Sequence, residues 1–257
     1  MAIKPIFALF TVFAISVPIG GCGGGSDSTP AAGATAPGGL YVGYYQEDPV
    51  TNPEDPLPGV FSLNLPAGNG AFSGSMYFTY VGCQSSNVGI VAGTKTEAAL
   101  AGTWSGTVDG SPQSGPYSGT YDQAVGSYAG TYNNAGGKQF RDLRPCIEYS
   151  IAPNGTWEMF PVETQVPASF NVTVSGRTIN WQSVSGADVS LVYVLDETVA
   201  TSTGNPVVWQ TLIAAGTTAV IPSSVLLQAG GGYIASVGVS DANRRRLAFG
   251  SRRFVQP

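Results

Sequence analysis

Four similar phrases between residues 70 and 132 set the pattern of apolar and polar positions in the first half of the chain. They read GAFSGSM from Gly70, GTWSGTV from Gly102, GPYSGTY from Gly115 and GSYAGTY from Gly126. Because side chains alternate between the two faces of a β-strand, each phrase places its aromatic residue and its last residue on one face. The phrases therefore predict four half-buried strands. Glycines on the aromatic face leave gaps that rings from neighbouring strands can cover.

The spacing of these phrases predicts an antiparallel meander. The last three begin 13 and 11 residues apart, which is about one strand and one turn, and glycine-rich turns separate them. Such a meander closes into an up-and-down barrel, with an open sheet or a sandwich as alternatives. The GTW and GTY phrases also resemble hairpins of the small barrels in the avidin and lipocalin families. This resemblance implies architecture and carries no binding site.

Residues 161–257 show a second set of short alternating segments. Apolar residues alternate in FNVTVSG, RTINW, DVSLVYVLD and GGYIASVGVSD. About seven short strands fit into roughly ninety residues, which is the count of a sandwich domain. The low charge and the high glycine and proline content, 35 and 18 residues, also disfavour helices.

This segment resembles a fibronectin type III domain. The resemblance lies in Trp181 on the second strand, Tyr193 on the third, and Leu226 leading into Gly232 and Tyr233. It implies that Trp181 and Tyr193 are core residues and that Tyr233 forms a tyrosine corner. The expected fold class is all-β, with an N-terminal antiparallel meander or barrel-like domain over residues 40–160 and an Ig-like, type III-like β-sandwich over residues 161–257.

Residues 1–21 have the layout of a signal peptide. Lys4 is followed by an apolar core from Ile6 to Val17 and by small residues. This core is too short to span a bilayer as a helix, which needs about 20 residues. The end of the segment and the next residue, Ile-Gly-Gly-Cys, resemble the lipobox of bacterial lipoproteins. An ordinary signal peptide with an incidental cysteine is the alternative.

The lipobox resemblance implies that Cys22 carries the lipid and that the protein contacts the membrane through this anchor. The residue after the cysteine is Gly23 and not an aspartate. By the same resemblance, this implies sorting to the outer membrane in a host with two membranes. Residues 22–39 are rich in Gly, Ser, Ala and Pro and are expected to form a flexible tether. We therefore expect a cell-envelope protein, lipid-anchored to the outer membrane on its periplasmic or surface face.

The chain has three cysteines, an odd number for an exported protein. With Cys22 assigned to lipid, Cys83 and Cys146 can pair as one disulfide in an oxidising compartment. A reactive or metal-binding pair is the competing interpretation, but the chain has no histidine and no CxxC spacing.

Charge is low and uneven. Residues 40–160 have an excess of six acids, whereas residues 161–257 have one more arginine than acids, so nucleic acid is not an expected partner. The cluster Arg244, Arg245 and Arg246 is either a solvated turn or an anion contact. The anion could belong to lipid A phosphates, to a polyanionic partner or to the acidic N-terminal domain.

Other candidate sites rest on residue types alone, without a recognisable motif. Acids and prolines in residues 46–59 could hold calcium, although no spacing resembles a known loop. A sugar-binding platform could be formed, if they were exposed, by Tyr41, Tyr44, Tyr45 and Trp157. Glu148 and Glu158 could form a glycosidase pair, but they are also ordinary strand-surface acids. Lys95 and Lys138 lie in turn-like segments.

The sequence lacks the common catalytic motifs, and this decides the expected class of function. Without histidine, a GxSxG phrase or a Ser-Lys phrase, we expect no enzyme, no catalytic residues, no cofactor and no metal. The chain is predicted to be a surface lipoprotein that acts as a non-catalytic adhesion or envelope-assembly module toward a protein or glycan partner. The alternative is a lipoprotein that binds a small ligand or glycan in its N-terminal barrel.

Overall fold

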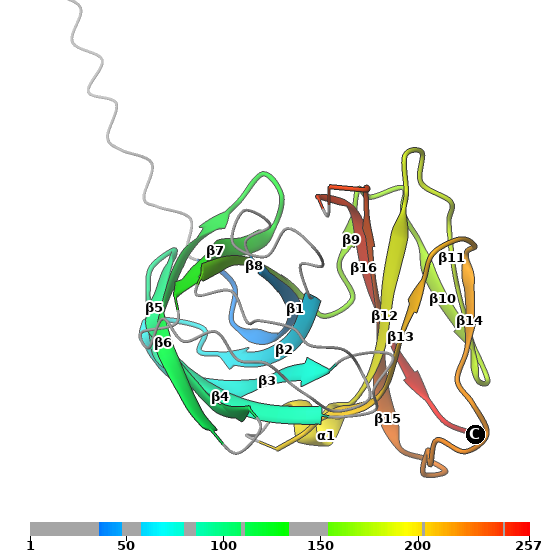
Figure 1. Ribbon diagram of the computed structural model, residues 1–257, viewed down its shortest axis with the longest axis horizontal. Helices are drawn as coiled ribbons and strands as arrows, with labels where there is room; N and C mark the ends of the chain where they lie inside the picture. Colours follow the sequence, from blue (N-terminus) through cyan, green and yellow to red (C-terminus); the bar gives the residue numbers. More distant parts are fainter. Residues whose placement is uncertain are drawn as a thin grey trace, which may run out of the picture. The chain divides into compact units, whose positions relative to one another are not determined.

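The computed structural model describes residues 36–47, 58–79, 86–108, 111–133, 154–201, 204–243 and 245–257. Within these ranges the chain forms sixteen strands and one four-residue helix, which confirms the all-β prediction. Residues Gly33–Pro257 form one compact unit. Figure 1 shows a barrel on one side of this unit and a sandwich of two smaller sheets on the other.

The first eight strands form a closed antiparallel barrel. Each strand pairs with the next, and β1 closes the ring against β8 through a register that runs from Tyr41–Pro161 to Glu47–Gly155. The barrel is therefore the closed form of the predicted meander. The strands are β1 (Gly39–Glu47), β2 (Pro58–Leu65), β3 (Gly70–Thr79), β4 (Ser86–Thr96), β5 (Ala99–Val108), β6 (Ser111–Asp122), β7 (Ser127–Asn133) and β8 (Asn154–Pro161).

Aromatic rings fill the barrel. The aromatic residues of the four phrases are all buried in one interior cluster, as their period-two pattern predicts; they are Phe72, Trp104, Tyr117 and Tyr128. Ring pairs such as Tyr117–Trp157 and Phe61–Trp157 meet edge to face with centroids 6.0 Å apart, the arrangement that the aromatic quadrupole favours.

Interior glycines make room for these rings. A Cβ atom on Gly119 would overlap the Trp157 ring and the Ala129 carbonyl oxygen, and one on Gly59 would overlap the Tyr45 ring. The predicted gaps are therefore present, and a ring from another strand occupies each of these two.

Gly119→Ala is expected to destabilise the protein by about 1–3 kcal/mol, because the added methyl forces a ring and a backbone carbonyl to move in a packed interior. Gly68→Ala is the matched control, since no heavy atom lies within 4 Å of the position of its Cβ. Denaturant unfolding of both variants measures the difference. Equal stability of the two variants would contradict the packing described for Gly119.

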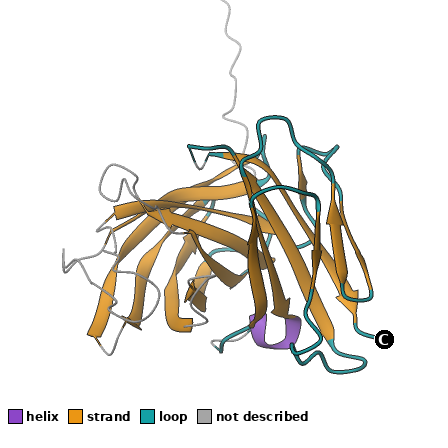
Figure 2. Ribbon diagram, turned by 45° about the vertical axis from the view of Figure 1, so that its right-hand side comes forward, coloured by secondary structure: helices purple, strands orange, loops and turns teal. Residues whose placement is uncertain are grey.

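Two sheets and a short helix form the C-terminal part. One sheet has the order β13-β12-β15-β16-β9 and the other β10-β11-β14. The connections β11–β12 and β13–β14 lie at one end of this sandwich, and the helix α1 lies at the other (Figures 1 and 2). The elements are β9 (Gln165–Val166), β10 (Val172–Ser175), β11 (Thr178–Trp181), β12 (Val189–Asp196), α1 (Glu197–Ala200), β13 (Val207–Ile213), β14 (Thr218–Val220), β15 (Gly232–Ser240) and β16 (Arg246–Val255).

The space between the two sheets holds the core expected of a sandwich. Trp181 and Tyr233 both belong to it. The Tyr233 hydroxyl accepts a hydrogen bond of 2.7 Å from the backbone N–H of Gln228, so the predicted tyrosine corner is confirmed.

The larger sheet is buried on both faces. Val192 and Val194 of β12 face the sandwich core, whereas Leu191, Tyr193 and Leu195 face the barrel. The expectation that Tyr193 belongs to the core of the sandwich is therefore corrected. Its ring lies in a third core between sheet and barrel, and its hydroxyl donates to the Gly43 carbonyl at 3.3 Å.

This third core joins barrel and sandwich into one body. The outward faces of β1, β2, β3 and β8 contribute Val42, Val60, Tyr77 and Phe160. Phe160 stacks on Phe249 of β16 with centroids 4.2 Å apart. The two β parts thus bury apolar surface against each other as the layers of one domain do.

Candidate functional site

The barrel interior retains only a small cavity. Its volume is about 40 Å³, well below the roughly 150 Å³ of a cavity that binds benzene. The rings therefore occupy most of the interior. The lining residues are all apolar or aromatic: Tyr45, Phe61, Leu63, Met76, Val91, Trp104, Tyr117, Tyr132 and Trp157.

Two tyrosine hydroxyls in this interior, on Tyr117 and Tyr128, are buried and have no hydrogen-bond partner among the described residues. Burial raises the pKa of Tyr117 well above its ordinary value. Burial, with a smaller contribution from Tyr121, raises the pKa of Tyr128 to about 12. Both phenols thus stay neutral at any physiological pH.

The aromatic residues considered as a sugar platform are not exposed. Tyr41, Tyr45 and Trp157 are buried in the barrel interior. Tyr44 points outward, but it packs in the third core and donates its hydroxyl proton to Glu158 Oε2 at 2.9 Å. The platform hypothesis is therefore wrong for these four residues.

A polar network crosses from barrel to sandwich. Arg246 donates to Glu158 from Nε at 2.6 Å and from Nη2 at 2.9 Å, which is a bidentate pair. The two side chains are only 20% and 17% exposed. Arg246 also lies over the Phe160 ring, 5.2 Å from its centroid. Of the anions considered for the arginine cluster, Arg246 contacts a carboxylate of the N-terminal β domain.

The contacts within this network raise the pKa values of Arg246 and Tyr44. Desolvation opposes the charge of Arg246, but the hydrogen bonds and the negative charge of Glu158 outweigh it, and the pKa of Arg246 is raised. Burial, followed by the Glu158 charge, raises the pKa of Tyr44 well above its ordinary value. Glu158 is thus engaged by Arg246 and Tyr44, and Glu148, the other member of the considered glycosidase pair, lies outside the described residues.

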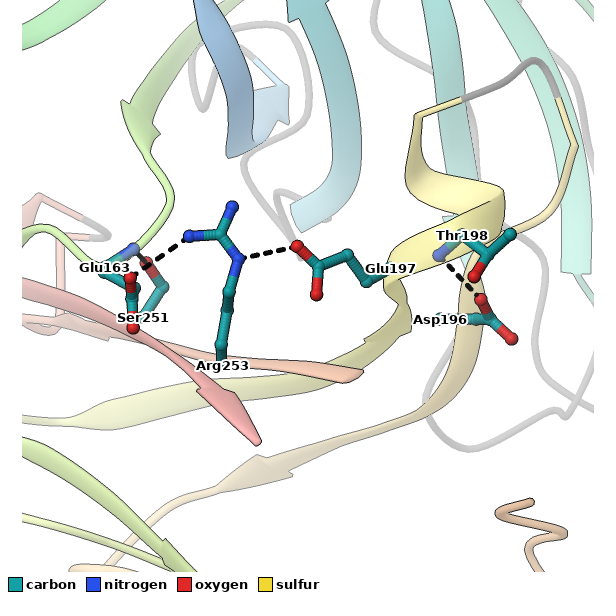
Figure 3. Close-up of polar contacts among 6 residues, drawn as sticks. All are labelled: Glu163, Asp196, Glu197, Thr198, Ser251 and Arg253. Carbon is teal, nitrogen blue, oxygen red and sulfur yellow. Dashed lines mark hydrogen bonds and ion pairs between the residues drawn. The ribbon is translucent and has the colours of Figure 1, made fainter. Parts of the chain in front are cut away.

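The remaining arginines have different surroundings. Arg245 is exposed; its backbone N–H donates to Asp241 at 2.8 Å, and its side chain makes no ion pair within the described ranges. Arg253 bridges Glu197 at 2.6 Å and Glu163 at 3.1 Å on a more exposed surface (Figure 3). Such exposed pairs contribute little stability.

Lys95 is not in a turn, as its sequence context suggested, but at the end of β4 and fully buried. Its Nζ donates to the carbonyls of Ala36, Pro66 and Ala67 at 2.6, 2.9 and 3.3 Å. Desolvation lowers its pKa. The ammonium thus joins residue 36 to the turn between β2 and β3.

A larger opening, a cleft of about 340 Å³, lies at the loop end of the sandwich. Residues 182–188 form one wall and residues 214–217 the other, and Trp181, Ser190 and Val239 form a buried floor. The N–H of Trp181 donates to the Thr217 carbonyl at 2.9 Å, which ties the second wall to β11. We call this opening the loop-end cleft.

Several predicted site residues fall outside the described ranges. These are Cys22, Cys83, Cys146 and Arg244, with most of the acidic segment 46–59 and Glu148.

The described residues contain no group of three or more histidine, cysteine or acidic side chains placed to hold a metal ion. They also contain no helix with the length and apolarity to cross a membrane. Comparison of the chain with protein-family models, with curated protein sequences and with solved structures gives no match.

The sequence reasoning missed the function of Lys95 and the third core. One signal for that core was available. The segment VSLVYVLD has apolar residues on both faces, with Val192 and Val194 between Leu191, Tyr193 and Leu195, which is typical of strands buried on both faces.

Proposed function

We propose that the protein is a lipid-anchored envelope protein that acts as a non-catalytic interaction module, with the loop end of its sandwich as the binding surface. The loop-end cleft is the observation that carries this proposal. Its volume of about 340 Å³ is within the roughly 300–1,000 Å³ usual for ligand sites.

The filled barrel supports a scaffolding role for the N-terminal part. With about 40 Å³ free inside, a ligand of ordinary size would have to displace interior rings. The third core and the Arg246–Glu158 pair then hold the sandwich on this scaffold. The strand order β10-β11-β14 facing β13-β12-β15-β16 is that expected of a type III-like domain, whose loops commonly form binding surfaces.

The anchor in this proposal is a lipid on Cys22. The thirteen residues between Cys22 and Ala36 are of tether composition and would span roughly 20 Å on average. The folded part would then remain near the membrane without being part of it. A disulfide between Cys83 and Cys146 would add stability in this oxidising compartment, by roughly 4–5 kcal/mol in the chain-entropy model.

The anchor is tested by Cys22→Ala. We expect the variant to leave the membrane fraction and appear in the soluble fraction, because the acyl chains are the only proposed membrane contact. Ser26→Ala, in the same tether, is the control and should stay with the membrane. Intact mass of the wild-type protein should show the acyl additions. A Cys22→Ala variant that still sediments with membranes would refute the anchor.

A further inference from the structure

The loop-end cleft is suited to an uncharged ligand. Among the described residues that line it, Asp188 is the only ionisable one. A phosphate or carboxylate ligand would find no cation in this lining, and burial of such a charge without a partner is costly. The lining therefore selects against anions.

The polar groups of the cleft are neutral hydrogen-bonding side chains. Gln182 and Ser183 are exposed on one wall, and Thr217 is half-buried on the other. None of these three side chains hydrogen-bonds to another described residue. An amide and two hydroxyls that face each other across an opening offer both donors and acceptors to a molecule between them.

The apolar part of the cleft lies below this polar rim. Val184, Val189 and Ile213 are half-buried and lie beside the buried Trp181 and Val239. A matching ligand therefore has one apolar face and a ring of neutral donors and acceptors. Pyranose sugars have this combination, because their C–H groups gather on one face and their hydroxyls lie around the edge.

The walls are held in place before any ligand arrives. Backbone hydrogen bonds join Ala187 to Val184 at 3.2 Å, Asp188 to Ser240 at 2.9 Å and Trp181 to Thr217 at 2.9 Å. The first wall turns at Gly186, whose φ of 80° favours glycine. A preformed site loses less conformational entropy on binding.

We propose that the loop-end cleft binds a neutral saccharide unit between residues 182–188 and residues 214–217. This inference rests on the proposed function and names the ligand class of its binding surface. Gln182, Ser183 and Thr217 hydrogen-bond the hydroxyl or acetamido groups of the sugar, and the apolar floor contacts its C–H face.

The test is a calorimetric titration of the full chain with chitobiose, cellobiose and maltose as probes. We expect at least one disaccharide to bind with a Kd of about 1 mM, as a single-unit site of this size would give. The double variant Gln182→Ala/Thr217→Val should weaken binding about tenfold or more, which corresponds to the loss of about 1.4 kcal/mol. Ala215→Trp, which places a ring in the cleft from an exposed position, should abolish it.

Gln228→Ala is the matched control, because this glutamine is also exposed but lies in the connection before β15, away from the cleft lining. It should bind as the wild type does. Absence of binding for all three disaccharides at about 10 mM, or binding that the cleft variants leave unchanged, overturns the inference.

The outcome is separable from that of the anchor test. Membrane association that depends on Cys22, together with no saccharide binding, removes the ligand class and leaves the anchored protein. Saccharide binding by a protein whose membrane association does not need Cys22 supports the ligand class and refutes the anchor.

Discussion

The C-terminal sandwich produced without the barrel, as residues 161–257, will not be a soluble folded monomer. Removal of the barrel uncovers Leu191, Leu195, Ile234 and Phe249, all buried in the third core. Each such side chain contributes about 1.5–3 kcal/mol when fully buried, so the loss is roughly 6–12 kcal/mol. That is comparable to the whole stability of a typical domain, about 5–15 kcal/mol. Size-exclusion chromatography and circular dichroism of the fragment measure the result.

A redesigned fragment provides the control. Substitution of Leu191, Tyr193, Ile234 and Phe249 by threonine makes the uncovered face polar and leaves the sandwich core around Trp181 intact. This fragment should be soluble and rich in β-structure. If the unmodified fragment is itself a stable monomer, the third core is not needed for folding.

Arg246→Ala is expected to destabilise the full chain by about 2–3 kcal/mol, below the cost of breaking a fully buried ion pair, because it leaves the half-buried Glu158 carboxylate without its positive charge. Glu158→Ala should have an effect of similar size for the converse reason. The double variant Arg246→Met/Glu158→Leu replaces both charges by apolar side chains and should recover much of the loss. Denaturant unfolding of the three variants and the wild type measures whether removal of both charges costs less than removal of one.

Arg253→Ala is the control within the same strand. Its ion pairs to Glu163 and Glu197 are 41% exposed on the arginine side, and solvent screening should limit its effect to about 1 kcal/mol or less. If Arg246→Ala costs no more than Arg253→Ala, the network around Glu158 does not hold the junction.

These expectations bear on how the module would work. Since the same sheet packs on the barrel with one face and on β10, β11 and β14 with the other, loosening of the junction exposes apolar surface. Under the proposed function, residues 22–39 would tether the folded part to the membrane, and the loop-end cleft would be its binding surface. This division suits a protein that must find a partner near a membrane and hold it in a defined orientation.

The sequence predicted which residues lie inside the barrel better than it predicted the surroundings of the outward-facing residues. Phe72, Trp104, Tyr117 and Tyr128 could be placed inside because each stands in a phrase with clean period-two alternation. The burial of Ser62 and Ser75 could not be predicted from the sequence. Their side chains point out of the barrel and are fully buried because another part of the chain covers them. Lys95 was misplaced for a related reason, since its three carbonyl partners come from the segment before β1 and from the β2–β3 turn.

The candidate site shows the same limit. The alternation in β12 predicted that Leu191, Tyr193 and Leu195 share a buried face, but not that the barrel covers it. Arg246 could be recognised as a possible anion contact, yet its partner Glu158 lies 88 positions away. The loop-end cleft had no sequence motif, because two loops with unrelated sequences form it, and the pairings of β11 with β14 and of β12 with β13 bring them together.

The sequence by itself determined the all-β class, the inward faces of the barrel strands and the tyrosine corner at Tyr233. Only the tertiary structure decided the closure of β1 on β8, the third core, the Arg246–Glu158 pair and the cleft. The physical reason is the range of each effect. Local alternation records whether a face of a strand is buried, whereas the surface that buries it, and the charge that pairs there, come from strands that are distant in the chain.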